Sequence, residues 1–190
     1  MFLVAHTGLA TAPAALVARW WGERRGFAGP PPDLRWLIAG TVLPDLVDKT
    51  VGQVLFKPYF ENGRIFGHTF VVALLVSVAG AYRWRRRGDS RVLLLACGMA
   101  SHLVLDRMWT DPTTAFWPAL GPFERHPSLQ TILAQVIDAL RDPFFWVDEL
   151  GGAALLGLSL RWLGVRSRAD LRSFVLAGRA PYLVQLEAGG

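Results

Sequence analysis

The chain contains little charge and almost no cysteine. Only 18% of its 190 residues are charged, whereas 52% are hydrophobic. Ordinary soluble chains carry about a quarter charged residues. The single cysteine, Cys97, excludes an internal disulfide framework and a CxxC metal site. Because Cys97 lies inside an apolar run, we expect a buried thiol without chemistry. The composition favours a membrane protein.

A net charge of +5 is not evidence of nucleic-acid binding here. The arginines gather at the ends of apolar segments, in residues 23–25 and 83–87, instead of interleaving with aromatic residues along a groove-like stretch. Cytoplasmic loops of membrane proteins have this pattern. The chain starts with apolar residues and no basic region, so we expect a retained first helix and not a cleaved signal. We expect membrane lipid as a partner and no nucleic acid.

Apolar stretches predict an all-α, polytopic membrane helix bundle of about four to five helices. They cover residues 2–21, 34–47, 66–82, 91–108 and 144–163. A full span needs roughly 20 residues, so the short second stretch is either a half-span or a packed core helix. Helical periodicity at 128–140 predicts an additional short amphipathic helix. We therefore expect one membrane-embedded domain over 1–165 and a cytoplasmic tail over 166–190.

Arginine and lysine predict how these segments are oriented. If the segments alternate across the bilayer, 14 of the 20 basic residues fall on one side, which should be cytoplasmic. Ten of the fifteen acids then fall on the opposite side, together with every histidine. The histidines are His6, His68, His102 and His126. The sequence thus predicts imidazole and carboxylate groups converging at the extracytoplasmic face of an integral membrane protein.

Spacing indicates which of these groups share a helix face. His102 and Asp106 stand four residues apart, and Asp45 and Asp48 stand three apart. A charged carboxylate inside a membrane segment costs roughly 2.5–3.5 kcal/mol, so it needs a partner or a function. Imidazole and carboxylate are ligands of zinc and neighbouring divalent metals. More than four candidate ligands suggests two metals, a common arrangement for phosphoester hydrolysis.

Each piece also has a simpler structural interpretation. A single HxxxD pair is often a hydrogen bond between helices, and a Pro-Asp dipeptide is often a turn or a helix start. Asp148 and Glu149 are acids that a helix N-terminus favours. His126 lies beside Pro127 and is expected at the surface. The convergence of several such groups on one face favours the metal interpretation over these alternatives.

Three sequence blocks occur together in order: GTVLPDLVDK, GRIFGHT, and SHLVLD followed by FWP at 116–118. With an early His6 and Gly8, they give the chain a resemblance over about residues 1–125 to the bacterial and archaeal membrane-bound metal-dependent hydrolases. More distantly, the chain looks like zinc-dependent phospholipase C. The resemblance implies a divalent metal cofactor. We expect one or two zinc ions, with manganese as the alternative. The ligands that the resemblance implies are His6, Asp45, Asp48, His68, His102 and Asp106.

The resemblance also assigns Arg64 to a phosphate or carboxylate, because its planar guanidinium suits oxyanions. Asp48 or Glu149 is the expected general base. The predicted function is a membrane-embedded metal-dependent hydrolase acting on a small-molecule phosphoester or a lipid-like substrate. The alternatives are a non-catalytic membrane protein, either a carrier or an interaction subunit, and a soluble all-α enzyme.

Overall fold

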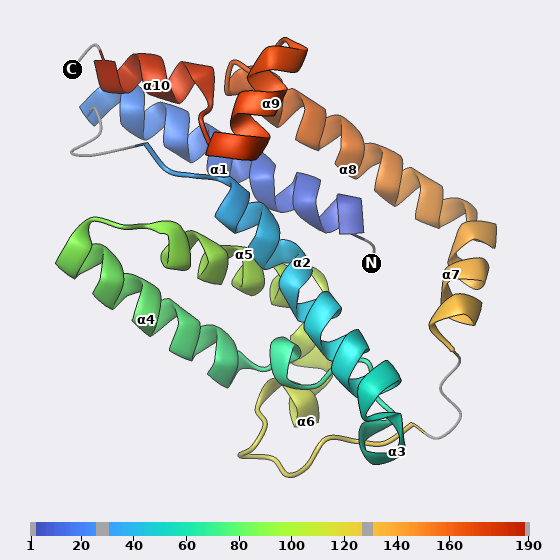
Figure 1. The fold of residues 1–190 in the computed structure, drawn as a ribbon. Helices are drawn as coiled ribbons and strands as arrows, with labels where there is room; N and C mark the ends of the chain where they lie inside the picture. The colour runs from blue at the N-terminus through green and yellow to red at the C-terminus, as the bar shows by residue number, and fades with distance from the viewer. Residues whose placement is uncertain (1–2, 26–30, 127–130, 189–190) are drawn as a thin grey trace.

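The computed structural model describes residues 3–25, 31–126 and 131–188, and every regular element in these ranges is helical (Figure 1). The predicted all-α class is therefore confirmed. Each apolar stretch forms one long helix. These helices are α1 (Leu3–Arg25), α2 (Arg35–Lys49), α4 (Phe70–Arg87), α5 (Arg91–Leu105) and α8 (Pro143–Trp162).

Shorter helices connect the long ones. A π-helical segment, Thr50–Leu55, continues α2, and 3₁₀ turns form at Phe66–His68 and Met108–Thr110. The short α-helices are α3 (Lys57–Phe60), α6 (Pro112–Ala115), α7 (Ile132–Arg141), α9 (Arg168–Ala177) and α10 (Pro181–Ala188). The amphipathic helix predicted at 128–140 is seen as α7, and residues 128–130 lie outside the described ranges.

Within the described ranges, no helix combines the length and the sustained apolar character that crossing a bilayer requires. The polytopic arrangement stays a prediction.

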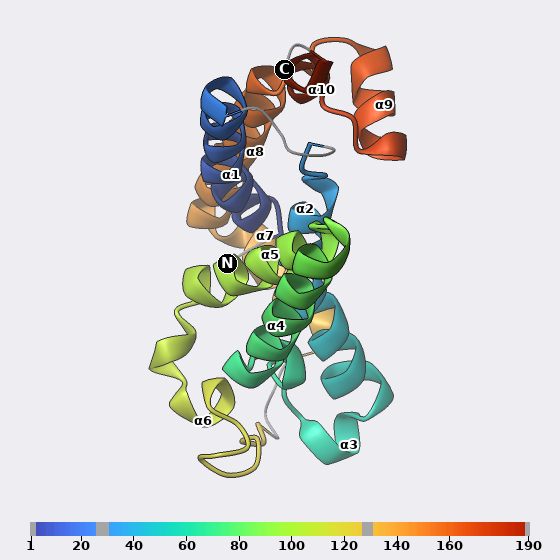
Figure 2. The same cartoon turned by 90° about the vertical axis from the view of Figure 1, so that its left-hand side faces the viewer.

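Close helix crossings at glycine form the frame of the molecule. Helix α1 packs along α8, and α2 packs along α5, which also contacts α4 (Figures 1 and 2). A Cβ atom added at Gly8 would lie only 2.1 Å from the carbonyl oxygen of Gly152. A Cβ atom at Gly98 would lie 2.1 Å from the carbonyl oxygen of Leu37. Glycine lets the backbones touch at both crossings, as small residues do between membrane helices.

The region expected as a tail is part of the packed structure. In the described part of 166–190, Phe174 of α9 and Leu183 of α10 are buried with Ala15, Leu34 and Leu163 in one apolar cluster. Ser167 and Asp170 form a capping box that starts α9. These two helices therefore close the end of the bundle at which α1 and α8 finish.

Cys97 differs from the sequence expectation, because its side chain is exposed. Its neighbours Ala96 and Gly98 take the buried positions on α5. The prediction of a buried thiol was therefore wrong. Because α5 is apolar on several faces, its sequence does not show which face packs against other helices.

The helix ends rich in arginine lie on one side of the molecule. In Figure 1 the ends of α1, α4 and α8 and the starts of α2 and α5 all lie toward the upper left. The start of α8 lies at the right beside α7, and the opposite ends of α1, α2, α4 and α5 lie near the centre and lower part of the view. This second region contains the histidines and aspartates of the candidate site.

Candidate metal centre

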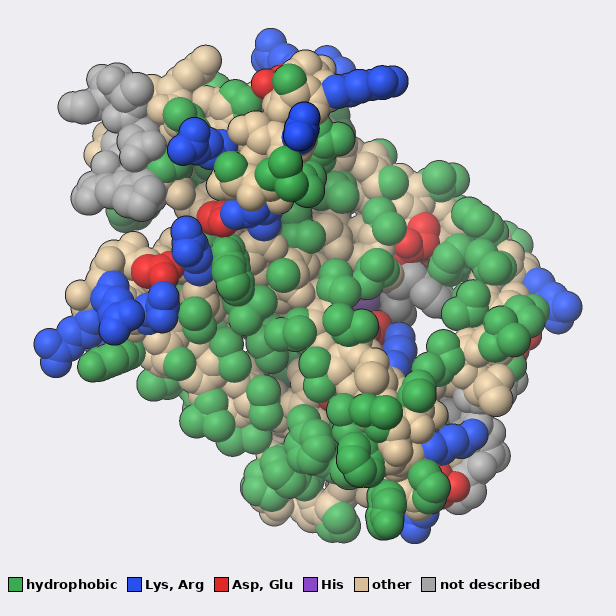
Figure 3. Space-filling view, viewed as in Figure 1, with side chains coloured by type: hydrophobic (Ala, Val, Ile, Leu, Met, Phe, Trp, Pro, Cys, Tyr) green, Lys and Arg blue, Asp and Glu red, His purple; other side chains and the backbone are tan. Residues whose placement is uncertain are grey.

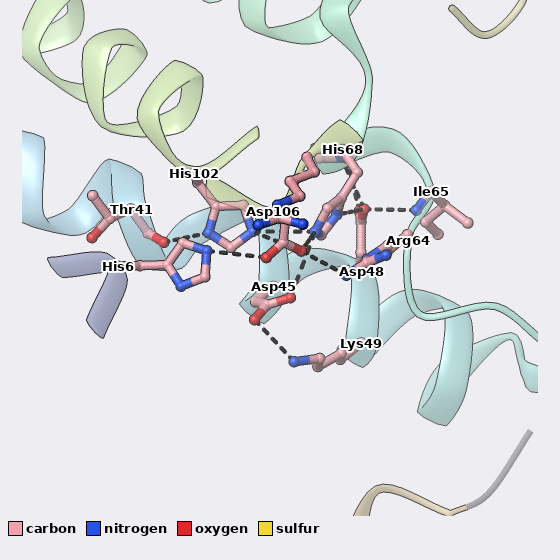
Figure 4. A network of polar contacts seen from close by, with 12 residues as sticks. His6, Thr41, Asp45, Asp48, Lys49, Arg64, Ile65, His68, His102 and Asp106 are labelled. Carbon is pink, nitrogen blue, oxygen red and sulfur yellow. Dashed lines mark hydrogen bonds and ion pairs between the residues drawn. The ribbon is translucent and has the colours of Figure 1, made fainter. Parts of the chain in front are cut away.

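A polar cluster forms where α1, α2, α5 and the turn before α4 meet (Figure 4). The six predicted ligands and Arg64 all lie in it: His6, Asp45, Asp48, Arg64, His68, His102 and Asp106. The α2–α5 crossing positions two of its elements, because Gly40 precedes Thr41 directly and Gly98 lies one turn before His102. Close backbone packing therefore fixes the distance between α2 and His102.

Two imidazoles point their Nε2 atoms at each other. His68 Nδ1 is 2.7 Å from Asp48 Oδ2, and His102 Nδ1 is 2.8 Å from the carbonyl oxygen of Thr41. Since the Thr41 carbonyl only accepts, His102 Nδ1 donates to it, and His68 Nδ1 likewise donates to the Asp48 carboxylate. Both neutral rings then direct an Nε2 lone pair inward, with the two atoms 3.2 Å apart. Lone pairs at this distance repel unless a proton or a cation lies between them.

The spacing of these nitrogens fits a tetrahedral metal. Zinc–nitrogen bonds of about 2.0–2.1 Å at a tetrahedral angle separate two ligand nitrogens by about 3.3 Å. The His68–His102 separation of 3.2 Å agrees with that value. Both rings are fully buried, so bulk water does not solvate their inward nitrogens.

Two carboxylates complete a set of four donors. Asp45 Oδ1 lies 3.6 Å from His68 Nε2, and Asp106 Oδ2 lies 3.7 Å from the same atom. Asp106 Oδ2 is also 4.0 Å from His102 Nε2. Two imidazoles and two carboxylates suit zinc or manganese, and their negative charge would balance a divalent ion. The residues present therefore fit the metal that the sequence implied.

His6 supports Asp106 from the other side. Its Nε2 lies 3.0 Å from Asp106 Oδ1, and its ring stacks on His102 with centroids 4.5 Å apart. His6, His102 and Asp106 form a second group whose ligand atoms lie within 4.8 Å of one another. The other group is Asp45, His68 and His102, so His102 belongs to both.

Asp48 lies behind His68. Its fully buried carboxylate accepts from the backbone N–H groups of Ile65 (2.7 Å), Gly67 (2.8 Å) and His68 (3.2 Å) in addition to the His68 ring. A carboxylate that orients a ligating histidine in this way is a common outer partner of metal sites. A Cβ atom on Gly67 would lie 3.1 Å from Asp48 Oδ1, so glycine makes room for the carboxylate. The expected roles of Asp48 as ligand and base stay predictions.

Glu149 is bound to the start of α1. Its Oε2 accepts from the Val4 N–H at 3.1 Å, and its Oε1 accepts from the Ala5 N–H at 3.2 Å. An acid in this place satisfies free N–H groups and complements the positive end of the helix dipole. The contact depends on the Gly8–Gly152 crossing, which places the start of α8 beside α1. The general-base role of Glu149 also stays a prediction.

Two cations border the cluster. Arg64 Nη2 lies 2.9 Å from Asp106 Oδ2, and its side chain is 45% exposed, so the guanidinium faces both the site and solvent. Lys49 Nζ lies 2.9 Å from Asp45 Oδ2. Sequence reasoning missed Lys49 and Thr41, although each stands four residues from Asp45 on α2. That i,i+4 spacing was the available signal. His126, by contrast, is exposed, as expected.

A turn ends α5 directly beyond the cluster. Arg107 has a φ of +53°, in the left-handed region that is costly for residues other than glycine. The chain therefore turns away immediately after Asp106, which caps α5. Strained backbone of this kind is often retained at functional sites.

The cluster is accessible from one side of the molecule. Figure 3 shows histidine, acidic and basic side chains together beside an opening between the helical body and α7. Exposed apolar side chains surround this region on α7 and the start of α8. The exposed apolar residues of α7 and the first turns of α8 include Leu133, Val136, Leu140, Phe144, Val147 and Leu150.

Comparisons with known proteins indicate the family. Neither the curated proteins nor the solved structures include a significant match to the chain. A family model described as the YdjM inner membrane protein matches residues 1–177, which is nearly the whole chain and includes the entire His/Asp cluster. The chain therefore belongs to the YdjM inner membrane protein family.

Proposed function

We propose that this chain is a membrane-bound, metal-dependent hydrolase whose His/Asp cluster acts on a phosphoester or lipid-like substrate. The observation that carries the proposal is the pair of buried Nε2 atoms of His68 and His102, 3.2 Å apart and each fixed by a hydrogen bond at Nδ1. Two carboxylates lie within 4 Å of these atoms. Membership of an inner membrane protein family supports the membrane location.

Four residues would hold the ion: His68, His102, Asp45 and Asp106. When bound, a zinc or manganese ion supplies Lewis-acid activation of water and of the substrate's oxygen. Asp48 keeps His68 in the tautomer that presents Nε2 inward. His6 holds the second oxygen of Asp106, so that carboxylate keeps its orientation.

Arg64 is suited to bind the substrate. Its guanidinium presents several N–H donors in a plane, and one of them, at Nη2, donates to Asp106 Oδ2 at 2.9 Å. With a side chain 45% exposed, it has donors available for a phosphate oxygen next to the cluster. This arrangement would place the anionic group of a substrate between Arg64 and the four candidate ligands.

The surroundings of the opening favour an amphiphile over a fully polar substrate. Phe144, Val147 and Leu150 on α8, and Leu133 on α7, each expose more than half of their side-chain surface. An apolar rim beside a charged site matches a molecule with a hydrocarbon part and a phosphoester head. The proposed substrate class is therefore lipid-like.

We also propose that the site faces the extracytoplasmic side. The arginine-rich helix ends lie opposite the cluster (Figure 1), and basic ends of membrane proteins favour the cytoplasm. The test is labelling of intact spheroplasts with a membrane-impermeant maleimide in a Cys97→Ser background. A His126→Cys variant should react, and an Arg87→Cys variant should react only after lysis. The reverse result would place the site in the cytoplasm.

A non-catalytic role is the competing proposal. A carrier needs polar groups through the depth of the protein, but the buried ionisable side chains in the described ranges are His6, Asp48, His68 and His102, all within the cluster. A single group of buried ionisable side chains suits chemistry or metal storage better than a conduit. An interaction subunit would bind metal without turning over any phosphoester.

Metal analysis of detergent-purified protein tests the proposal first. Wild type and a His126→Ala control should contain near-stoichiometric zinc or manganese, whereas His102→Ala/Asp106→Ala should lose it. Turnover of a chromogenic phosphodiester and of phospholipid should follow the metal content. Absence of metal from correctly folded wild type, or equal turnover by Asp106→Ala, would overturn the proposal.

A further inference from the structure

A cluster of arginines lies at the end of α4 that is far from the metal centre. A cavity of about 330 Å³ opens between the last turns of α4 and the first turn of α5. Its lining is Ala79, Tyr82, Arg83, Arg86, Arg87 and Val92. His68 precedes α4 and Arg86 lies eighteen residues later, so at 1.5 Å per residue the two regions are about 27 Å apart. The proposed hydrolase site does not account for this cavity.

The cavity has an apolar floor because α4 and α5 meet closely beside it. A Cβ atom on Gly80 would lie 2.6 Å from the backbone nitrogen of Leu93. Gly88, with a φ of +66°, ends α4 in a left-handed conformation and returns the chain into α5. Ala79 and Val92 supply the apolar part of the lining, here called the floor, and Arg83, Arg86 and Arg87 supply the cationic part, here called the rim.

Positive charge at the rim exceeds the negative charge available to balance it. Arg83 Nε binds Asp89 Oδ2 at 2.8 Å. Arg86 lies 5.7 Å from the centroid of the Tyr82 ring, which orients its guanidinium. In the described part of the chain, no carboxylate lies within ion-pair distance of Arg86 or Arg87. The rim therefore has two guanidinium groups without an acidic partner.

Tyr82 also lines the cavity, and Trp84 lies on another face of the same turns of α4. Tyr82 is 64% exposed and Trp84 is 53% exposed, both on the last turns of α4. Amphipathic rings of this kind are enriched at the level of lipid headgroups. An apolar floor, a cationic rim and the ring of Tyr82 match an amphiphilic anion. They match a nucleic acid less well, because the floor offers no polar contacts to it.

We propose that this cavity is a binding site for an anionic glycerophospholipid. The phosphate would contact Arg86 and Arg87, and an acyl chain would lie on Ala79 and Val92. Basic pockets between helices on the cytoplasmic side of membrane proteins bind such headgroups. The chain belongs to an inner membrane protein family, and membranes contain anionic glycerophospholipids. The site is independent of the proposed hydrolase activity.

Native mass spectrometry of the detergent-purified chain tests this site, with phosphatidylglycerol and phosphatidylcholine as probes. Wild type should retain phosphatidylglycerol adducts preferentially. The variant Arg86→Gln/Arg87→Gln should lose about tenfold or more of that preference, because each arginine contributes substantially near an anionic headgroup. The matched control is Arg24→Gln/Arg25→Gln. It removes the same charge from a neighbouring helix end, where the arginines lie over Trp20 and Trp21. It should change the preference less than about twofold.

A second variant keeps the test decisive if the arginine pair impairs folding. Ala79 is exposed, so Ala79→Trp should fold, fill the floor and lower phosphatidylglycerol retention without any change in charge. Equal losses in the two arginine pairs, or unchanged retention in Ala79→Trp, would overturn the proposal. Binding of a DNA duplex that depends on Arg86 and Arg87, without phosphatidylglycerol preference, would overturn it as well.

Discussion

The Nε2 atoms of His68 and His102 lie 3.2 Å apart, although the two residues are 34 positions apart in the sequence. Each ring is held from behind, one by the Asp48 carboxylate and the other by the Thr41 carbonyl. Two acceptor nitrogens held this close need a cation or a proton between them.

Asp48→Asn should weaken metal binding. The amide can donate toward His68 Nδ1, which would favour the tautomer that carries a proton on the inward Nε2. Loss of such an outer partner typically costs about 10–100-fold in metal affinity. Competition with a chromophoric chelator measures the change, and exposed Asp138→Asn on α7 is the matched control. Unchanged affinity in Asp48→Asn would show that the outer hydrogen bond has no role in binding.

Glu149→Gln should affect stability and not catalysis. The carboxylate accepts from the Val4 and Ala5 N–H groups and complements the positive start of α1. Removing its charge should lower the melting temperature in detergent, whereas turnover at a temperature where the variant is folded should stay within about twofold. A large loss of kcat in the folded variant, with normal metal content, would instead support the general-base role.

Arg64→Ala should impair recognition of an anionic substrate. A charged hydrogen bond contributes about 1.5–3 kcal/mol, which corresponds to about 10–100-fold in kcat/KM. Metal content should stay normal, because Arg64 contributes no ligand. Arg125→Ala is the control, since this exposed arginine binds Glu61 outside the cluster. Equal kcat/KM for Arg64→Ala and wild type would exclude contact with the substrate.

Gly98→Ala should separate α2 from α5. The added Cβ atom would meet the Leu37 carbonyl oxygen at 2.1 Å, so the helices must move apart, at a cost of about 1–3 kcal/mol. The same shift would stretch the bond between His102 and Thr41 and lower metal content. Gly157→Ala on α8 meets nothing within 4 Å and should raise stability by about 0.5–1 kcal/mol. Thermal unfolding in detergent compares the pair, and equal stability of both variants would contradict the close crossing.

The loop between α4 and α5 should show a small acid dependence. The Arg91 backbone N–H and the Arg83 guanidinium hold the pKa of Asp89 below its usual value. A lowered pKa stabilises the fold above the unfolded-state value near 3.8, and the effect is lost as the pH falls through the folded-state value. Asp89→Asn should therefore be slightly less stable than wild type near neutral pH, by less than about 1 kcal/mol because the pair is exposed and screened. The difference should disappear in acid and shrink in high salt.

Sequence reasoning identified the helices and the composition of the centre for physical reasons. Long apolar runs bounded by charged or proline-containing segments favour helices, and each of the five stretches forms one helix. The alternating path placed imidazoles and carboxylates at one level, and the structure brings six of them together: His6, Asp45, Asp48, His68, His102 and Asp106. Whether a segment is helical, and which end of its helix carries the polar groups, are local properties. Local composition is sufficient to predict them.

Only the tertiary structure decided which of those residues face a common point. Asp48 and Asp45 are close neighbours on α2, yet one is fully buried behind His68 and the other directs an oxygen toward His68 Nε2. Glu149 was grouped with the site by depth alone, and packing of α8 along α1 attached it to the first turn of α1. Composition and charge along the chain determine which groups reach one level of the molecule. Helix rotation and close glycine crossings determine their contacts, because both depend on packing between segments far apart in the sequence.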